Sequence, residues 1–318
     1  MRFVFLGSPP FATPVFERLL RGPHQALALV TLPDRPRGRG QKVEPSALVR
    51  LAHEREIPVL QPDDPHSAAH VDQLRALAPD VLLVASYGVI LKPATLELAP
   101  HGALNVHASL LPRNRGASPI QAAIQSGDAK TGVSLQRIVQ RLDEGDVMLA
   151  REHVIGPEDS AAELLDALAV LGGELAAQGL DLLAQGRAVF TPQDHTRATF
   201  ARKLKKEHGR MDFTGSAADL ARQVRAQNPW PGARCLDPKG RELVVLRARA
   251  VETTTTGEPG ELLETSPRAV LACGASALEL IEVVPAGKRP MSAPDFLRGL
   301  RAVQGERFAS LPLGAKEA

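Results

Sequence analysis

Short segments that are apolar throughout alternate with amphipathic segments along the first half of the chain. The apolar segments, which we interpret as strands, are 2–7, 26–33, 80–86 and 103–109. Between them, segments such as 44–56 repeat apolar residues every three or four positions, which is the spacing of one helix face. Strands without a polar face are buried on both sides, and helices that alternate with them connect parallel strands. The pattern predicts an α/β domain with a doubly wound, mostly parallel, Rossmann-like sheet.

The pattern changes after a long helical segment at 160–186. The stretch 191–213 is polar, shows little apolar periodicity and contains the basic run ARKLKKEHGR, which is typical of a linker. Short apolar strands separated by Gly and Pro follow, among them ELVVLRARAVE and AVLACG. Many short strands of this kind favour a smaller, OB-like β-barrel. We therefore predict a first domain at 1–190, a basic linker at 191–210 and a barrel domain at 211–318.

Length and composition agree with a globular protein of two domains. The 318 residues are 44% hydrophobic and 23% charged, and we expect no apolar run long enough to cross a bilayer. The apolar start ends after a few residues in Gly-Ser-Pro-Pro, which does not match a signal peptide. Two cysteines without a pairing pattern are typical of a reducing compartment. The sequence therefore predicts a cytoplasmic protein without a membrane segment.

Two polar residues, Asn105 and His107, lie inside the apolar strand at 103–109. Residues i and i+2 of a strand point to the same face, so Asn105 and His107 can converge on one atom. The strand ends at the edge where a doubly wound sheet binds its ligands. An alternative stays open, because Asn and His near strand ends often only cap loop backbone. Further along, we expect a strand from 136 that runs into an Asp-rich turn containing Asp143.

These residues belong to a wider resemblance. The motif Asn105-Val-His107 occurs together with the loop SLLPRNRGASPIQAAI, with TGVSLQ at 131–136 and with LDEGD at 142–146. With the opening FVFLGSPPFATPVFERL and the later segments KLKKEHGRMDF and RAQNPWPGA, they resemble the methionyl-tRNA formyltransferases, within the wider group that uses 10-formyltetrahydrofolate. The resemblance covers nearly the whole chain. Three positions depart from the family's usual residues, namely Pro10, Asn114 and Glu144.

The resemblance implies a formyltransferase domain followed by a tRNA-binding domain. The enzyme would transfer the formyl group of 10-formyltetrahydrofolate to the α-amine of methionyl-initiator-tRNA, for translation initiation. The amine would attack directly and form a tetrahedral intermediate, without a metal. Asn105 and His107 would donate to the oxyanion, and Asp143 would orient His107 and help to carry the proton to the folate nitrogen. These three are the predicted catalytic residues.

The same resemblance places the folate co-substrate against two segments. One set of contacts is expected from Ser109, Leu110, Leu111 and Pro112. The pterin ring is expected to lie against Tyr87, Gly88, Val89, Ile90 and Leu91. From the residues alone, this second segment is equally compatible with an ordinary connection between a strand and a loop.

Basic residues gather in three clusters, although the formal net charge is only +2. A solvated surface is the common explanation of such clusters. Because the clusters are spread over the chain, they suit a long polyanion better than a small anion, and with the resemblance they favour contacts to tRNA phosphates. The predicted tRNA-binding residues are Arg35, Arg37, Arg39, Lys42, Lys203, Lys205, Lys206, Lys288 and Arg289.

Other functions stay open at this point. Within the same group of enzymes the acceptor could be a small amine or an amino sugar nucleotide, although the second domain and the basic clusters favour tRNA. A nucleotide-binding oxidoreductase has little support, since GSPPFA lacks the glycine pattern of dinucleotide sites. A non-catalytic nucleic-acid-binding protein would explain the clusters but not Asn105, His107 and Asp143. For the preferred function we expect a monomer.

Overall fold

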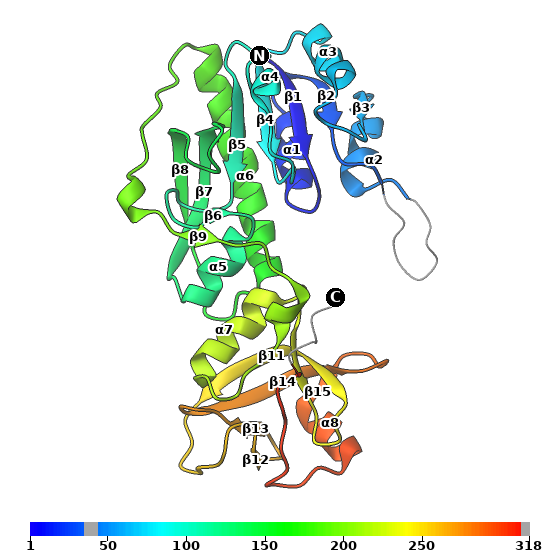
Figure 1. Cartoon of the computed structure of the whole chain (residues 1–318), viewed down its shortest axis with the longest axis vertical. Helices are drawn as coiled ribbons and strands as arrows, with labels where there is room; N and C mark the ends of the chain where they lie inside the picture. Colours follow the sequence, from blue (N-terminus) through cyan, green and yellow to red (C-terminus); the bar gives the residue numbers. More distant parts are fainter. Residues whose placement is uncertain (35–43, 313–318) are drawn as a thin grey trace. The chain divides into compact units, whose positions relative to one another are not determined.

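A mostly parallel sheet forms the centre of the first half of the chain in the computed structural model, which describes residues 1–34 and 44–312 (Figure 1). Within this described part, the sheet has seven strands in the order β3-β2-β1-β4-β5-β7-β8. They are β1 (Arg2–Gly7), β2 (Gln25–Val30), β3 (Val59–Leu60), β4 (Val81–Ala85), β5 (Ala103–His107), β7 (Lys130–Arg137) and β8 (Val147–Val154). β1 to β5 pair in parallel, whereas β7 runs antiparallel to β5 and β8 antiparallel to β7. The predicted doubly wound, mostly parallel sheet is confirmed.

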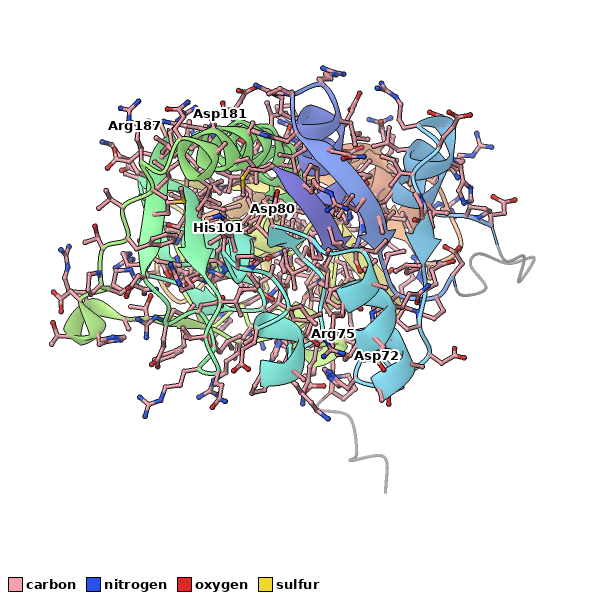
Figure 2. All side chains as sticks on the ribbon, turned by 90° about the horizontal axis from the view of Figure 1, so that it is seen from above. Asp72, Arg75, Asp80, His101, Asp181 and Arg187 are labelled. Atoms are coloured by element: carbon pink, nitrogen blue, oxygen red, sulfur yellow. The ribbon has the colours of Figure 1, made fainter. Side chains whose placement is uncertain are left out.

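Helices cover both faces of this sheet. α1 (Ala12–Leu20) and α6 (Ala161–Ala184) lie on one face, and α3 (Ala68–Ala76) lies on the other. Figure 2 shows this arrangement, with Asp181 of α6 and Asp72 of α3 on opposite sides of the strands. The other helices of this half are α2 (Ala47–Glu54), α4 (Pro93–Leu96) and α5 (Pro119–Ser126). Two covered faces are what strands without a polar side require.

Helix α6 is, within the described residues, the one helix long and apolar enough by composition to cross a membrane. The expectation that no apolar run reaches this length is therefore wrong. The most apolar part of α6 is 56% buried in the protein. Its Gly172 and Gly179 allow a close approach to Val106 of β5 and Leu135 of β7. Since core helices pass the same test of length and composition, the finding by itself assigns no membrane contact.

The second half of the chain forms an antiparallel sheet with the strand order β10-β11-β14-β13-β12, and β15 pairs with β14. Its elements are α7 (Ala217–Gln227), β10 (Ala233–Leu236), β11 (Glu242–Val251), β12 (Leu262–Glu264), β13 (Ala269–Ala272), β14 (Ala277–Pro285), β15 (Met291–Ser292) and α8 (Ala293–Leu300). The buried core between sheet and helices includes Phe213, Leu220, Val245, Leu280 and Phe296. The curled antiparallel sheet confirms the predicted class of the second domain.

The described residues pack as two compact units. The first comprises 1–119, 130–154 and 164–202, and the second comprises 120–129, 155–163 and the chain from Lys203 onward. The first part of the polar stretch that follows 190 thus lies in the first unit. There β9 (Phe200–Ala201) pairs in parallel with β6 (Arg115–Gly116). The domain boundaries at 190 and 211 stay a prediction, but the polar stretch contributes backbone to the loop region after β5.

β7 differs from the strand that the sequence predicts. The prediction placed a strand from 136 into the Asp-rich turn, whereas β7 ends at Arg137 and a loop at 138–146 precedes β8. In this loop Val139 and Leu142 are 40% and 58% exposed. The reason is tertiary, because the partner strand β5 begins at Ala103, which accepts from the N–H of Ile138, and offers no residues beyond it for pairing. Alternating apolar residues alone do not distinguish such a loop from a strand.

Candidate active site

β5 lies at the border between the parallel and the antiparallel parts of the first sheet. It pairs in parallel with β4 and antiparallel with β7. In the second pairing, Asn105 lies opposite Gln136 and His107 lies opposite Ser134. In open α/β sheets, ligands bind beyond the strand ends where the order of the strands reverses. The apolar strand therefore carries its two polar side chains to the edge where a ligand is expected.

His107 is buried, and both of its ring nitrogens face acceptors. Its Nε2 donates to the carbonyl oxygen of Asn114 at 3.0 Å, which assigns a hydrogen to this nitrogen. Its Nδ1 lies 3.7 Å from Oδ2 of Asp143. The side chains of His107 and Asp143 are only 6% and 9% exposed. The ring is thus held in one orientation, with Nδ1 turned toward the carboxylate.

The carboxylate of Asp143 is held by donors from several elements. Its Oδ2 accepts from the backbone N–H of Gly116 at 2.8 Å, and its Oδ1 accepts from Nε2 of Gln136 at 2.8 Å. Nδ2 of Asn105 donates to the same Oδ1 over a longer distance of 3.4 Å. Asp143 has a φ of 53°, in the left-handed region that aspartate and asparagine tolerate better than most residues. The structure therefore brings together the three predicted catalytic residues, Asn105, His107 and Asp143.

Serine hydroxyls fix the loop that follows β5. Oγ of Ser134 donates to the carbonyl oxygen of Ser109 at 2.7 Å and accepts from the N–H of Leu111 at 3.1 Å. The hydroxyl of Ser109 donates to the backbone carbonyl oxygen of Arg113, further along the same loop, at 2.6 Å. Ser109 is fully buried, whereas Leu110, Leu111 and Pro112 are partly exposed. Of these predicted folate contacts, the last three have side chains that a ligand can reach.

The other predicted folate segment divides between the core and the surface. Tyr87 and Leu91 are buried in the apolar core of the first unit. Burial raises the pKa of the Tyr87 hydroxyl, which has no hydrogen-bond partner among the described residues. Val89 is partly exposed, and Gly88 and Ile90 are exposed. A ligand on this surface could therefore touch the middle of the segment but not the side chains at its two ends.

Two further residues shape the site and were not in the predicted set. Gln136 is 1% exposed and lies opposite Asn105, but the stretch that contains it also buries Thr131 and Ser134, so the sequence alone gives it no distinct signal. Gly116 acts through its backbone N–H, for which the sequence carries no direct signal. Its φ of 115° favours glycine, and a Cβ there would lie 2.6 Å from the carbonyl oxygen of Ala201.

The structure describes some of the predicted tRNA-binding residues and leaves others outside its described part. The first cluster, Arg35, Arg37, Arg39 and Lys42, lies outside the described residues. In the second unit, the exposed members are Lys203, Lys205, Lys206, Lys288 and Arg289. Nζ of Lys205 lies 3.5 Å from Oε1 of Glu207. These cations therefore present charge to the solvent, as a phosphate contact would require.

Two of the departures from the family's usual residues adjoin the site. Asn114 is buried with a φ of 56°, a conformation that asparagine tolerates better than most residues, and its N–H donates to Oγ1 of Thr199 at 2.8 Å. Oε1 of Glu144 lies 3.4 Å from Nη1 of the buried Arg115. The third departure, Pro10, is exposed before α1. Asn114 and Glu144 thus belong to the residues that surround the predicted catalytic residues, Asn114 through its contact with His107 and Glu144 through its contact with Arg115.

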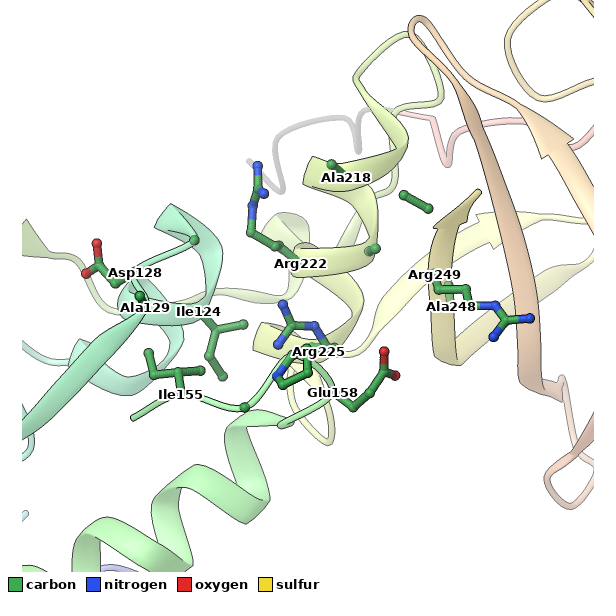
Figure 3. Close-up of a pocket in the computed structure, with 15 residues that line it drawn as sticks. Ile124, Asp128, Ala129, Ile155, Glu158, Ala218, Arg222, Arg225, Ala248 and Arg249 are labelled. Carbon is green, nitrogen blue, oxygen red and sulfur yellow. The ribbon is translucent and has the colours of Figure 1, made fainter. Parts of the chain in front are cut away.

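A separate pocket lies in the second unit (Figure 3). Its volume is about 420 Å³, and Arg222 and Arg225 of α7 line it together with Glu158, Ile155 and Ala248. Nη1 of Arg225 donates to a backbone carbonyl at 3.0 Å, and burial lowers the pKa of this side chain. The three predicted catalytic residues do not line this pocket, which is therefore distinct from the candidate active site.

Asn105, His107 and Asp143 supply an amide, an imidazole and a carboxylate at one strand end. This set suits hydrogen-bond donation to a developing negative charge and the transfer of protons.

Among the described residues, no group of three or more His, Cys, Asp or Glu side chains could hold a metal ion. Burial raises the pKa of Cys235 to about 12 and that of Cys273 to about 11, so both are neutral thiols at neutral pH.

Comparison with known sequences finds relatives along the whole chain. Residues 1–180 match the formyl transferase family, and residues 203–301 match the formyl transferase C-terminal domain. The chain is 42% identical to the methionyl-tRNA formyltransferase of Methylococcus capsulatus, over 98% of this chain and 100% of that protein. It is 46% identical to the methionyl-tRNA formyltransferase of Anaeromyxobacter dehalogenans, over 95% of this chain and 97% of that protein.

Solved structures share the fold at lower identity. An N-formyltransferase from Helicobacter canadensis, in complex with folinic acid and dTDP-3-aminofucose, has a TM-score of 0.65 at 15% identity, over 87% of this chain and 98% of that chain. HypX from Aquifex aeolicus, in complex with tetrahydrofolic acid, has a TM-score of 0.61 at 20% identity, over 93% of this chain and 47% of that chain. Likeness at these identities shows a common fold.

Proposed function

The chain belongs to the methionyl-tRNA formyltransferase family, and from this premise we propose that it transfers the formyl group of 10-formyltetrahydrofolate to the α-amine of methionyl-initiator-tRNA. The observation that carries the proposal is the convergence of Asn105, His107 and Asp143 at the end of β5. Relatives named for this activity match the chain at 42% and 46% identity over nearly their whole length. Formyl transfer to an amine needs an oxyanion donor, a proton acceptor and a charge partner, and the three side chains can supply them.

The proposed reaction proceeds by direct attack. The amine nitrogen forms a bond to the formyl carbon, whose carbonyl oxygen becomes an oxyanion, and the attacking nitrogen becomes positively charged. The intermediate collapses when the bond between the carbon and N10 of the folate breaks. The proton lost by the amine is delivered to N10. The products are formylmethionyl-tRNA and tetrahydrofolate, and no bond to the enzyme forms.

Asn105 is suited to stabilise the oxyanion. Its side-chain amide has two N–H donors, and one of them is directed to Asp143 over a long distance of 3.4 Å. The second donor is then left for the oxygen of the tetrahedral intermediate. A fixed donor of this kind typically lowers the barrier by about 3 to 4 kcal/mol.

His107 is suited to move the proton through Nδ1, because Nε2 already donates to the carbonyl of Asn114. A neutral ring with its hydrogen on Nε2 has an acceptor at Nδ1. After it takes the amine proton, its Nδ1–H faces Asp143, 3.7 Å away, and the carboxylate stabilises the positive ring. The same proton can then pass to N10 of the folate. While it is charged, His107 would stabilise the oxyanion electrostatically, because both of its N–H groups face other acceptors.

We propose that the formyl donor, the folate, and the formyl acceptor, the tRNA, bind on either side of the three predicted catalytic residues. We place the folate against the loop at Leu110 to Pro112 and against the exposed part of the pterin segment at Gly88 to Ile90. Complexes of structural neighbours with tetrahydrofolic acid and folinic acid support a folate donor. The exposed basic clusters support tRNA as the acceptor. We further propose a cytoplasmic monomer that has no membrane contact and needs no metal.

Incubation of the purified protein with 10-formyltetrahydrofolate and charged methionyl-initiator-tRNA tests the function. Formylated methionyl-tRNA should appear on an acid gel. Parallel reactions with elongator methionyl-tRNA, glycinamide ribonucleotide and an amino sugar nucleotide test the other acceptors. Product from a small amine but not from initiator tRNA would replace the proposed acceptor, and absence of product in all reactions would refute the proposed activity.

A further inference from the structure

Gln193 connects the polar stretch after α6 to the Asp143 loop. The residue is 8% exposed. Its Nε2 lies 2.9 Å from the carbonyl oxygen of Asp143 and 2.6 Å from that of Gly145. It also lies 3.3 Å from Oε1 of Gln136. One buried amide therefore reaches the backbone on both sides of residue 144 and the side chain that binds the Asp143 carboxylate.

The orientation of the Gln193 amide is dictated by Arg115. Nε and Nη2 of Arg115 lie 3.2 Å and 2.7 Å from Oε1 of Gln193. A guanidinium group can only donate, so the oxygen of the amide must face Arg115 and the nitrogen must face the two carbonyls. Arg115 itself is 1% exposed and also donates to Nδ1 of His195 at 3.0 Å. The buried cation thus acts as a fixed support for the amide.

The same amide influences the side chain of Asp143 through Gln136. Nε2 of Gln193 has two hydrogens for three acceptors, so its longest contact, 3.3 Å to Oε1 of Gln136, shares a hydrogen with one of the carbonyls, and it still favours the oxygen of the Gln136 amide on this side. The nitrogen of Gln136 is then directed to Oδ1 of Asp143 at 2.8 Å. Gln193 therefore contacts both the backbone carbonyl of Asp143 and the side chain of Gln136, which binds the Asp143 carboxylate.

We infer that Gln193 is a positioning residue for Asp143, and that Arg115 sets the direction in which it acts. The inference rests on the proposed role of Asp143 in proton transfer. Without the two hydrogen bonds to the carbonyls of Asp143 and Gly145, the loop would relax and the carboxylate would move away from Nδ1 of His107. Displacement by about 1 Å can reduce the rate of an enzymatic step about 100-fold.

The substitution Gln193→Glu tests this inference because it keeps the shape and the partner Arg115 but removes both donors. We expect kcat for formylation to fall by about 10- to 100-fold, while KM for methionyl-tRNA and for the folate changes little. Gln178→Glu is the matched control, because exposed Gln178 also accepts from an arginine, Nη2 of Arg151, at 3.1 Å. The control should keep the kcat of the unaltered protein.

A double-mutant cycle with Asp143→Asn separates positioning from general damage. If Gln193 acts through Asp143, Gln193→Glu should cause little further loss of kcat in the Asp143→Asn background. Multiplicative losses, or an unchanged kcat in Gln193→Glu, would overturn the inference. An Asp143→Asn enzyme with normal kcat would instead overturn the proposed role of Asp143. If the Gln193→Glu protein does not fold, Gln193→Met, which also lacks the donors, takes its place in the same cycle.

Discussion

Asn105 and His107 owe their common direction to the alternation of side chains along a strand. Both stand in an otherwise apolar strand, which is why the sequence already identified them. Asp143 is different, because it is 38 residues away from Asn105 and its place beside His107 depends on how the loop after β7 folds back. Its Asp-rich turn has no distinctive pattern of its own, so the family resemblance was needed to select it.

Replacement of His107 or Asp143 by Ala should reduce turnover much more than folate affinity. His107→Ala and Asp143→Ala each remove a group that handles the proton, and loss of such a group typically lowers kcat by about 10² to 10⁴. Single-turnover formylation gives the rate, and calorimetry with tetrahydrofolate gives the dissociation constant. Equal losses in rate and affinity would contradict a catalytic role and indicate a binding role.

The elements around the site were predictable to different degrees. β5 and the long helix α6 have strong apolar patterns, and both occur where the sequence predicts them. β6 and β9 have two residues each, too few for any periodicity, and they pair across the chain from Arg115 to Phe200. The interpretation of the stretch after 190 as a linker missed this pairing, because a polar segment that supports a site resembles a solvated one.

Gly116 offers a test of the pairing between β6 and β9. Gly116→Ala adds a Cβ 2.6 Å from the carbonyl oxygen of Ala201 at a φ of 115°, so we expect it to lower the free energy of unfolding by about 3 kcal/mol. Turnover should also fall, since the Gly116 N–H would leave Asp143. Urea denaturation and formylation rates measure the two effects.

Gly186→Ala is the control for this substitution. Gly186 also has a positive φ, of 65°, but a Cβ there meets nothing within 4 Å. Only the backbone preference is lost, so its cost should be about 1 kcal/mol and its turnover normal. Equal stability and activity in the two variants would show that the close approach of β6 and β9 has no role in holding Asp143.

The two units bring different properties to the whole molecule. The first holds the proposed chemistry, and the second presents exposed cations at Lys203, Lys205, Lys206, Lys288 and Arg289. The chain matches its relatives over both units, including a C-terminal formyl transferase domain at 203–301. Because tRNA is a long polyanion, we expect the second unit to contribute affinity for backbone phosphates, with a corresponding dependence on salt.

Replacement of Lys203, Lys205 and Lys206 together by Ala should weaken the binding of methionyl-tRNA and make it less sensitive to salt. For every phosphate that the variant no longer neutralises, the slope of log K against log salt should become shallower by about 0.7 to 0.9. Fluorescence anisotropy between about 50 and 200 mM KCl, the range in which such phosphate binding is most visible, gives the slope.

Three arginines of the same unit provide a charge-matched control. Arg268, Arg298 and Arg307 are exposed, and each pairs with a carboxylate, whereas within the described residues Lys205, 3.5 Å from Glu207, is the only one of the three lysines that does so. Their joint replacement by Ala removes the same charge from positions already neutralised, so it should leave the slope nearly unchanged. Identical slopes in the two triple variants would mean that net charge, and no specific contact of the lysines, governs tRNA binding.

The sequence by itself determined the order of the main elements, the classes of both domains and the pair Asn105 and His107. These follow from local periodicity and from side-chain alternation, which neighbouring residues decide among themselves. Only the tertiary structure decided which distant groups meet, such as Asp143 with His107 and Gln193 with the Asp143 loop, 50 residues apart. Hydrogen bonds between distant segments depend on how loops fold back on the sheet. The residues next to a polar loop residue in the sequence therefore do not identify its hydrogen-bond partner.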